Sequence, residues 1–280
     1  MTPSRWAACA VVLSLTPAGN AWSAGPYWTG GYFGANAGGG VGQADLRTSV
    51  EAPGAYFLPA DIAQIGDSGR QKTTSNLWTA GLQAGYDYQV GAIVYGLEAD
   101  LDGFGQKASR TVSEMYNSAP GVTFTLEQSV RTDWLFTVRP RIGLAVSDFL
   151  FYATAGVAET RIKYTEKFTD TFNPALATDS VSKTRIGWIA GAGCEYALND
   201  RWSIKGEYLY ADFGRFSNSS VLQMPAGLGD KFNHSIGLDA HIVRLGLNFR
   251  FDGGEFGAGH PAARRVRRVE DMTNAPIYAF

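Results

Sequence analysis

The sequence predicts an all-β fold, an eight-stranded antiparallel transmembrane β-barrel with four long extracellular loops and short periplasmic turns. Runs of about ten residues alternate between an apolar face and a face of glycines and ionisable side chains, as strands between lipid and a polar lumen do. Short turns and long hydrophilic segments alternate between these runs. The chain has no run of about eighteen apolar residues, so no transmembrane helix is expected.

The stretch 186–211 shows this alternation most clearly. The apolar face of its first run carries Ile186, Trp188, Ala190, Ala192, Cys194 and Tyr196. The same face of its second run carries Trp202, Ile204, Gly206, Tyr208 and Tyr210. The polar residues 198–201 supply the turn between the two runs. This stretch is therefore predicted to be a hairpin with lipid on one side.

Six other runs have the same period of two. They span 32–41, 77–88, 92–101, 132–146, 149–161 and 241–251. The short turns are expected at 89–91, 147–148 and 198–201, and the long loops at 42–76, 102–131, 162–184 and 215–240. Short turns on one side and long loops on the other are typical of an outer-membrane barrel, and an even number of strands closes the sheet without an edge.

Several segments carry a family resemblance, and they occur in the family's order. They read WTGGYFGANAG at 28–38, TVRPRIG at 137–143, GAGCEYALNDRWS at 191–203, KGEYLYADFG at 205–214 and LGLNFRF at 245–251. These segments resemble the small alphaproteobacterial outer-membrane barrels, the porin-like surface antigens related to opacity proteins and haemin-binding proteins. The resemblance implies a Gram-negative outer-membrane location and says little about activity.

The N-terminal residues 1–24 are predicted to be a signal peptide for the general secretory route. Arg5 precedes a short apolar core at 6–15, and small residues follow, with cleavage expected between positions 21 and 24. Once this segment is removed Cys194 is the only cysteine left, so no intrachain disulfide is expected.

The barrel is predicted at 28–251 and a flexible periplasmic tail at 252–280. The resemblance implies that Gly246, Phe249 and Phe251 belong to the signal that the barrel-assembly machinery reads. The tail contains an arginine cluster at 264–268, which leaves open a contact with cell-wall polymer or anionic lipid. The other expected partners are outer-membrane lipid and lipopolysaccharide.

The inward faces of the predicted strands are rich in charge. The expected lumen-facing residues are Glu98, Asp100, Arg139, Arg141, Glu195, Lys205, Glu207, Arg244 and Arg250. An eight-stranded barrel is just wide enough for side chains to fill it, and a buried charge without a partner is costly. We therefore expect a network of ion pairs that plugs the lumen rather than an open pore.

No catalytic, cofactor-binding or metal-binding residue is predicted. His234 has Ser235 and Asp239 nearby in sequence, but such adjacency does not make a catalytic triad. Haem binding stays open through an exposed His234 or through loop residues such as Met115 and Tyr116. The net charge of −2 shows no basic excess, so nucleic acid is not an expected partner.

The expected role is that of a structural protein and surface antigen of the cell envelope, without enzymatic activity. Two alternatives remain at this stage: a small porin-like channel for ions or small solutes, and capture of haem or a surface ligand by the loops. Aromatic loop residues would form an adhesive patch in the second case, namely Tyr56, Phe57, Tyr116, Phe168 and Phe172. The rival fold is a soluble lipocalin-like barrel with its apolar face inside.

Overall fold

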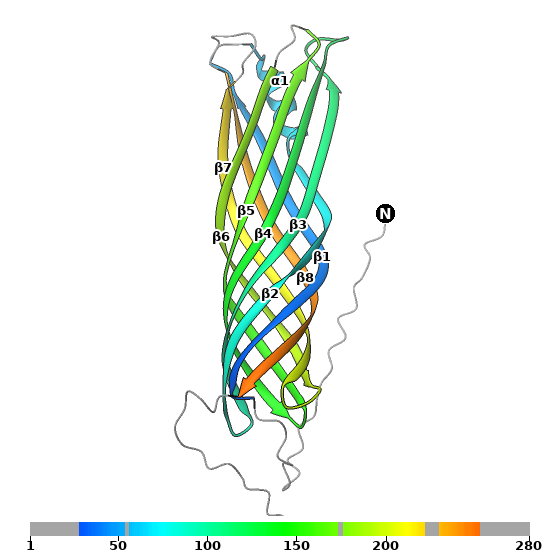
Figure 1. The fold of residues 1–280 in the computed structure, drawn as a ribbon. Coiled ribbons are helices and arrows are strands. Elements are labelled where there is room, and N and C mark those ends of the chain that lie inside the picture. The colour runs from blue at the N-terminus through cyan, green and yellow to red at the C-terminus, as the bar shows by residue number, and fades with distance from the viewer. Residues whose placement is uncertain (1–27, 54–55, 173–175, 222–229, 253–280) are drawn as a thin grey trace, which may run out of the picture.

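The computed structural model describes residues 28–53, 56–172, 176–221 and 230–252. Within them the chain forms eight strands and one helix, shown in Figure 1. The elements are β1 (Gly30–Glu51), α1 (Pro59–Ser68), β2 (Gln71–Val90), β3 (Ile93–Met115), β4 (Thr123–Val146), β5 (Phe149–Asp170), β6 (Leu176–Ala197), β7 (Trp202–Val221) and β8 (Lys231–Asp252). Each strand pairs antiparallel with the next, and β1 pairs with β8, so the sheet is a closed ring. The predicted fold class is confirmed. The predicted signal peptide 1–24 and nearly all of the predicted tail 252–280 lie outside the described residues.

The strands are about twice as long as the sequence predicted, at 20 to 24 residues each. About ten residues are enough for a tilted strand to cross a bilayer, so the barrel continues well beyond a membrane. The short connections 91–92, 147–148 and 198–201 lie at one end, and we call the part of the ring next to them the turn half. The part at the other end is the loop half. Much of each segment predicted as a long loop is strand in the loop half, so the predicted bounds of those four loops were too wide.

Strand β8 shows why these extensions were missed. In its turn half the outward residues Val243 and Leu245 are 60% and 63% exposed, whereas the inward Arg244 is buried. In its loop half the inward residues Ile236 and Leu238 are buried, and the outward side chains are polar. The alternation thus continues with the apolar face reversed at about residue 240. Water surrounds the loop half, so its apolar residues pack inside, as in a soluble barrel.

The turn half carries a band of apolar side chains on its outer wall. Leu82, Leu97, Ile142, Val157 and Leu247 are between 44% and 69% exposed. A continuous apolar surface of this kind on a closed barrel is what a hydrocarbon environment requires and water disfavours. The lipid-facing side predicted for these strands therefore agrees with the structure, and the lipocalin-like arrangement does not. Separately, no helix in the described ranges has the length and hydropathy needed to cross a bilayer.

Two apolar clusters fill the interior of the loop half. The first lies directly above the charged lumen and includes Phe104, Ile162, Ile189 and Leu209. The second lies at the mouth of the ring and consists of Val50, Phe57, Ile65, Tyr116, Phe124, Leu126, Phe168, Ala177 and Phe232. Helix α1 lies at this mouth in Figure 1 and inserts Ile65 into the second cluster. The predicted adhesive patch is therefore wrong for Phe57, Tyr116 and Phe168, which are buried; Phe172 is 73% exposed.

Strand β4 contains an irregularity that changes which residues point inward. Its pairing with β5 shifts between Thr132 and Leu135, and Leu135 is buried on the inner face. Uninterrupted alternation would turn Asp133 to the lumen together with Arg139 and Arg141, but Asp133 lies 2.7 Å from the exposed Lys163 on the outside. The extra residue of a bulge moves every later side chain to the other face, and this reversal is what places Arg139 and Arg141 inside.

The ring is less completely paired between β6 and β7 than elsewhere. Their backbone pairing stops at Trp188 and Asp212, although both strands continue into the loop half. Beyond that point side chains cross from β6 to β7 instead: Lys183 Nζ donates to Ser217 O at 3.3 Å. Charged side chains that reach over an open strand edge are a common protection against pairing with another chain.

The reversal of faces can be tested with one arginine placed on each side of it. Leu247→Arg puts a charge on the lipid-facing band and is expected to cost about 2–4 kcal/mol near the middle of a bilayer. Ser109→Arg, on the exposed polar wall of the loop half of β3, should cost almost nothing. Urea unfolding in lipid vesicles measures both variants. Equal stability of the two variants would contradict the assigned faces.

Candidate functional site

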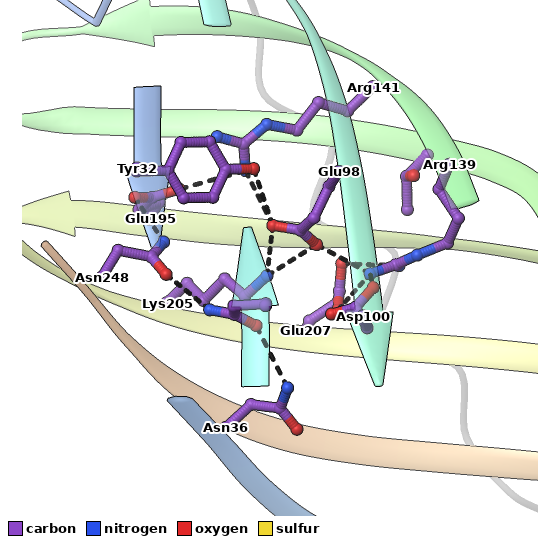
Figure 2. Close-up of polar contacts among 12 residues, drawn as sticks. Tyr32, Asn36, Glu98, Asp100, Arg139, Arg141, Glu195, Lys205, Glu207 and Asn248 are labelled. Atoms are coloured by element: carbon purple, nitrogen blue, oxygen red, sulfur yellow. Dashed lines mark hydrogen bonds and ion pairs between the residues drawn. The ribbon is translucent and has the colours of Figure 1, made fainter. Parts of the chain in front are cut away.

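The charged groups of the lumen form one connected cluster in the turn half. The nine residues predicted to face the lumen are buried inside the ring. They come from β3, β4, β6, β7 and β8, so residues more than a hundred positions apart meet on the barrel axis. Figure 2 shows the side chains converging from opposite walls.

Arg139 lies at the centre of the cluster and is fully buried. Its NH2 donates to Glu98 Oε1 and to Asp100 Oδ2, both at 2.7 Å, and its NH1 donates to Glu207 Oε1 at 3.0 Å. Nε donates to the hydroxyl of Thr137 at 3.2 Å. All three guanidinium nitrogens are thus engaged, and one cation joins β3, β4 and β7.

Arg244 of β8 makes a second junction on the same acids. Its Nε donates to Glu207 Oε2 at 2.8 Å, and its NH2 donates to Asp100 Oδ1 at 2.8 Å. NH1 reaches Asp102 Oδ2 at 3.0 Å. Because Glu207 and Asp100 each bind both arginines, the two cations share carboxylates and the ring is tied across its diameter.

Lys205 is the second cation that binds the Glu98 carboxylate. Its Nζ donates to both carboxylate oxygens of Glu98, at 2.8 and 2.7 Å, and the hydroxyl of Tyr32 donates to Oε2 at 2.8 Å. Glu98 therefore receives three different donors when Arg139 is included, which offsets the cost of burying its charge. Figure 2 shows Glu98 between Tyr32 and Lys205.

Arg141 forms a third group nearer the turns. It donates from Nε and NH2 to the two oxygens of Asp87 at 2.9 and 2.5 Å, a two-pronged contact, and from NH1 to Glu195 Oε2 at 3.2 Å. Arg250 NH2 also donates to Asp87 Oδ2 at 3.2 Å. Ser203 and Asn248 donate to Glu195.

Two inward glycines make room for aromatic rings in this layer. A Cβ at Gly85 would lie 2.3 Å from the hydroxyl oxygen of Tyr32, and one at Gly193 would lie 2.5 Å from that of Tyr152. The two tyrosine rings flank the guanidinium of Arg141 at 4.7 and 5.1 Å, within cation–π distance. The glycine-rich inward faces thus supply the space that bulky lumen side chains need.

Some members of the cluster were not predicted from the sequence. Asp102 was assigned to a loop because the predicted strand ended at residue 101, but β3 continues and Asp102 faces inward. Asp87 was not included in the predicted network, although it is buried on the inner face of β2. The polar side chains Asn36, Gln83 and Asn248 also form a chain of hydrogen bonds to Glu195. If the predicted strand had been extended to residue 106 with the same alternation, Asp102 would have been predicted to face the lumen.

The residues of the predicted assembly signal are divided between the two faces. Gly246 lies inside, where a Cβ would approach Gln83 Nε2 to 2.9 Å. Phe249 and Phe251 lie outside, and both rings pack near that of Phe33 at 5.5 and 6.2 Å between centroids. The role of these three residues in assembly stays a prediction.

His234 is not the exposed loop residue that the sequence analysis expected. It faces inward from β8, is 1% exposed, and lies in a polar layer between the two apolar clusters. Its Nδ1 is 2.8 Å from Glu166 Oε2 and its Nε2 is 3.1 Å from Ser220 Oγ. Ser235 and Asp239, its sequence neighbours, occupy the opposite face of the strand. The structure thus removes the basis for surface haem binding by His234.

Tyr164 and Gln128 complete this layer. The hydroxyl of Tyr164 donates to Glu166 Oε2 at 2.5 Å, and Gln128 donates to Thr48 Oγ1 at 2.9 Å. Burial and the nearby Glu166 carboxylate raise the pKa of Tyr164, so its hydroxyl stays a donor. Five strands are linked here by directional contacts inside an apolar surrounding. Among the described residues no group of three or more His, Cys, Asp or Glu side chains is arranged to hold a metal ion.

Comparison with known proteins decides the family. The profile of the outer membrane protein β-barrel domain matches residues 6–251. This chain belongs to that family. A 31 kDa outer-membrane immunogenic protein of Brucella melitensis is 35% identical over 226 residues, which cover 80% of this chain and 84% of the relative. A 22 kDa outer membrane protein of Rhizobium leguminosarum bv. viciae is 28% identical over 75% of this chain and 82% of the relative. The predicted alphaproteobacterial resemblance and outer-membrane location are confirmed.

Solved structures give only a distant likeness. Ail of Yersinia pestis covers 80% of this outer-membrane barrel and 100% of its own chain, at 15% identity and a TM-score of 0.28. The outer membrane protease OmpT of Escherichia coli covers 78% of this chain and 97% of its own, at 10% identity and a TM-score of 0.40.

Removing the central cation of the charged cluster is expected to lower the unfolding free energy of this outer-membrane barrel by a large amount. Arg139→Ala leaves Glu98, Asp100 and Glu207 short of a partner, so we expect a loss of about 3–5 kcal/mol in unfolding free energy. Arg131→Ala, which removes an arginine exposed by 67% and 3.6 Å from Asp133, should cost less than about 1 kcal/mol. Urea unfolding in lipid vesicles compares the two. Similar losses would show that the cluster is not a stabilising unit.

Proposed function

We propose that this protein is a sealed outer-membrane barrel that anchors a rigid extracellular β-column and presents it as a surface antigen. The observation that carries the proposal is the filling of the interior at every level of the ring. Trp28, Val94 and Leu150 form an apolar cluster near the turns, the charged cluster follows, and the two apolar clusters with the His234 layer fill the loop half. Several stacked layers would each have to open before water or ions could pass.

In this proposal the functional surface of the protein is the outer wall and the loops of the column. A column formed by strand pairing presents its outer wall and its loops in fixed positions, whereas four long loops would not. The immunogenic proteins of Brucella are relatives whose names fit such exposure. Outer-membrane lipid and lipopolysaccharide would surround the wall, the barrel-assembly machinery would insert it, and a contact of the tail with cell-wall polymer belongs to the same proposal.

The proposal assigns no catalytic activity. The Ser220–His234–Glu166 contact has the partners of a hydrolytic triad, but it is enclosed by apolar clusters above and below. A substrate carbonyl would need space beside the serine hydroxyl. Directional polar contacts inside an apolar core can instead hold strands in register, and this layer joins β1, β4, β5, β7 and β8 in that way.

Single-channel recording separates the sealed barrel from the porin-like alternative. The refolded mature protein in a planar bilayer is expected to give no current steps, because the charged and apolar layers together close the lumen. Insertion is verified by protease protection of the same sample, and a general porin serves as positive control. Reproducible steps that depend on the protein would overturn the sealed barrel and favour a small channel.

Labelling of intact cells tests which end of the column is exposed. In a Cys194→Ala background, Asn117→Cys at the loop end should react with a membrane-impermeant maleimide, because residue 117 is exposed in the β3–β4 connection. Asp200→Cys, in the exposed β6–β7 turn, should react only after the outer membrane is permeabilised. The reverse pattern would contradict the proposed orientation.

A further inference from the structure

The outer wall of the loop half contains a hollow of about 900 Å³. Four consecutive strands of the ring line it, in the order β2, β1, β8 and β7, and Arg70 lies at its edge. The strand register places Lys72 opposite Asp45 and Arg47 opposite Ser235. The hollow faces sideways, along the plane of the membrane, and not toward the mouth of the column.

Short polar side chains form the floor of this hollow. Ser49, Ser217, Ser219 and Ser235 point outward there, and Gly237 follows Ser235 on the same outer face of β8. A Cβ at Gly237 would meet no heavy atom closer than 3.7 Å. Hydroxyl groups at fixed spacing can both donate and accept hydrogen bonds, which suits the hydroxyl groups of a sugar.

Longer charged side chains form the rim, and part of their positive charge is unpaired. Asp45 is 2.6 Å from Arg215 and 3.2 Å from Arg47. Desolvation alone would raise the pKa of Asp45, but hydrogen bonds from these two arginines outweigh it and lower the pKa. Glu51 accepts a hydrogen bond from Asn233 at 2.9 Å.

Two cations of the rim are left for a ligand. Arg70 is 72% exposed, and its nearest carboxylate oxygen in an ion pair is that of the exposed Asp67 at 3.9 Å. An ion pair this long and this exposed contributes little to stability in water. Lys72 is exposed and has no carboxylate within ion-pair distance among the described residues. Cations beside a hydroxyl-rich floor suit a sugar that carries phosphate or carboxylate groups.

The height of the hollow indicates where such a sugar would come from. On β2 the outward apolar band ends at Trp78, and Lys72 lies six residues further along the same face. Six residues of a strand tilted by about 40° rise about 15 Å above that level. In an outer membrane this layer is occupied by the saccharide of lipopolysaccharide molecules anchored beside the protein.

We infer that the hollow is a binding site for the phosphorylated core oligosaccharide of a neighbouring lipopolysaccharide molecule, with Arg70 and Lys72 contacting its anionic groups and the serine floor contacting its hydroxyls. The inference rests on the proposed lipopolysaccharide surroundings and does not depend on whether the lumen is sealed. It gives the column a fixed lateral contact with the lipid leaflet that surrounds it.

Calorimetric titration with deacylated, phosphorylated core oligosaccharide tests the site without the lipid chains. The refolded mature protein in detergent should bind this probe at low salt, and Arg70→Glu with Lys72→Glu should weaken binding at least tenfold. Lys107→Glu with Lys167→Glu is the matched control, because both lysines are exposed on β3 and β5, outside the hollow, and neither has an ion pair within the described ranges. The control should bind as the unaltered protein does, and enzymatically dephosphorylated oligosaccharide should bind more weakly.

Several results would overturn the site. These are absence of binding by the unaltered protein, equal weakening by the two double variants, or equal binding of the dephosphorylated probe. A sulfated glycosaminoglycan fragment that bound more tightly than the core oligosaccharide at the same charge would overturn the lipopolysaccharide assignment. Circular dichroism of each variant confirms that the barrel is folded. Current steps from the same preparation would reject the sealed lumen and leave this inference untouched, so the two failures can be told apart.

Discussion

The structure depends on the requirement that charges buried on the barrel axis must find partners. Six carboxylates and five cations meet in the turn half, contributed by Asp87, Glu98, Asp100, Asp102, Glu195, Glu207, Arg139, Arg141, Lys205, Arg244 and Arg250. Taking any of these ions from water into a closed interior costs several kcal/mol unless well-oriented partners replace the solvent. Only a ring with this register brings Arg139 together with Glu98, Asp100 and Glu207. The charged cluster therefore selects the closed arrangement as much as it stabilises it.

A second constraint is the change of solvent along each strand. Lipid surrounds the turn half, so its apolar side chains face outward and its polar ones fill the interior. Water surrounds the loop half, so the preference is reversed and Phe104, Ile162 and Leu209 move inside. One chain thus contains an inverted barrel and an ordinary one on the same eight strands. The strand pairing passes through the boundary, apart from local shifts such as those at Gly103 and Thr132 and except between β6 and β7, where it stops at Trp188 and Asp212.

This arrangement explains how a small barrel can hold a tall column above a membrane. Strands alone would leave the far end open, and helix α1 together with Phe57 and Phe168 closes it. The open edge between β6 and β7 is the weakest part of the column, and Lys183 and Arg185 span it with side chains. The polar hollow with its two exposed cations begins on β7, next to this edge, and extends over β8 and β1 to β2.

Alternation along the chain was enough to predict the number of strands, their order in the ring, the lipid-facing side of the turn half and most of the lumen charges. Each of these follows from alternation with a period of two, which a strand imposes on its own side chains wherever its two faces meet different surroundings. The family resemblance added the cellular location. Alternation did not reveal the loop half, because many of its outward residues are small polar side chains that also occur in loops, such as Ser217, Ser219 and Asn233.

Which charged side chains bind each other follows from the folded ring and could not be predicted from the chain. Asp102 joins Arg244 because β3 continues past the predicted end, and Asp133 leaves the lumen because a bulge on β4 shifts the phase by one residue. His234 was expected in a surface loop but lies in a buried layer, because β8 extends through it and turns it to the inner face with Phe232 and Ile236. Partners separated by a hundred residues depend on the register of all strands between them, and a single sequence carries no local signal for that register.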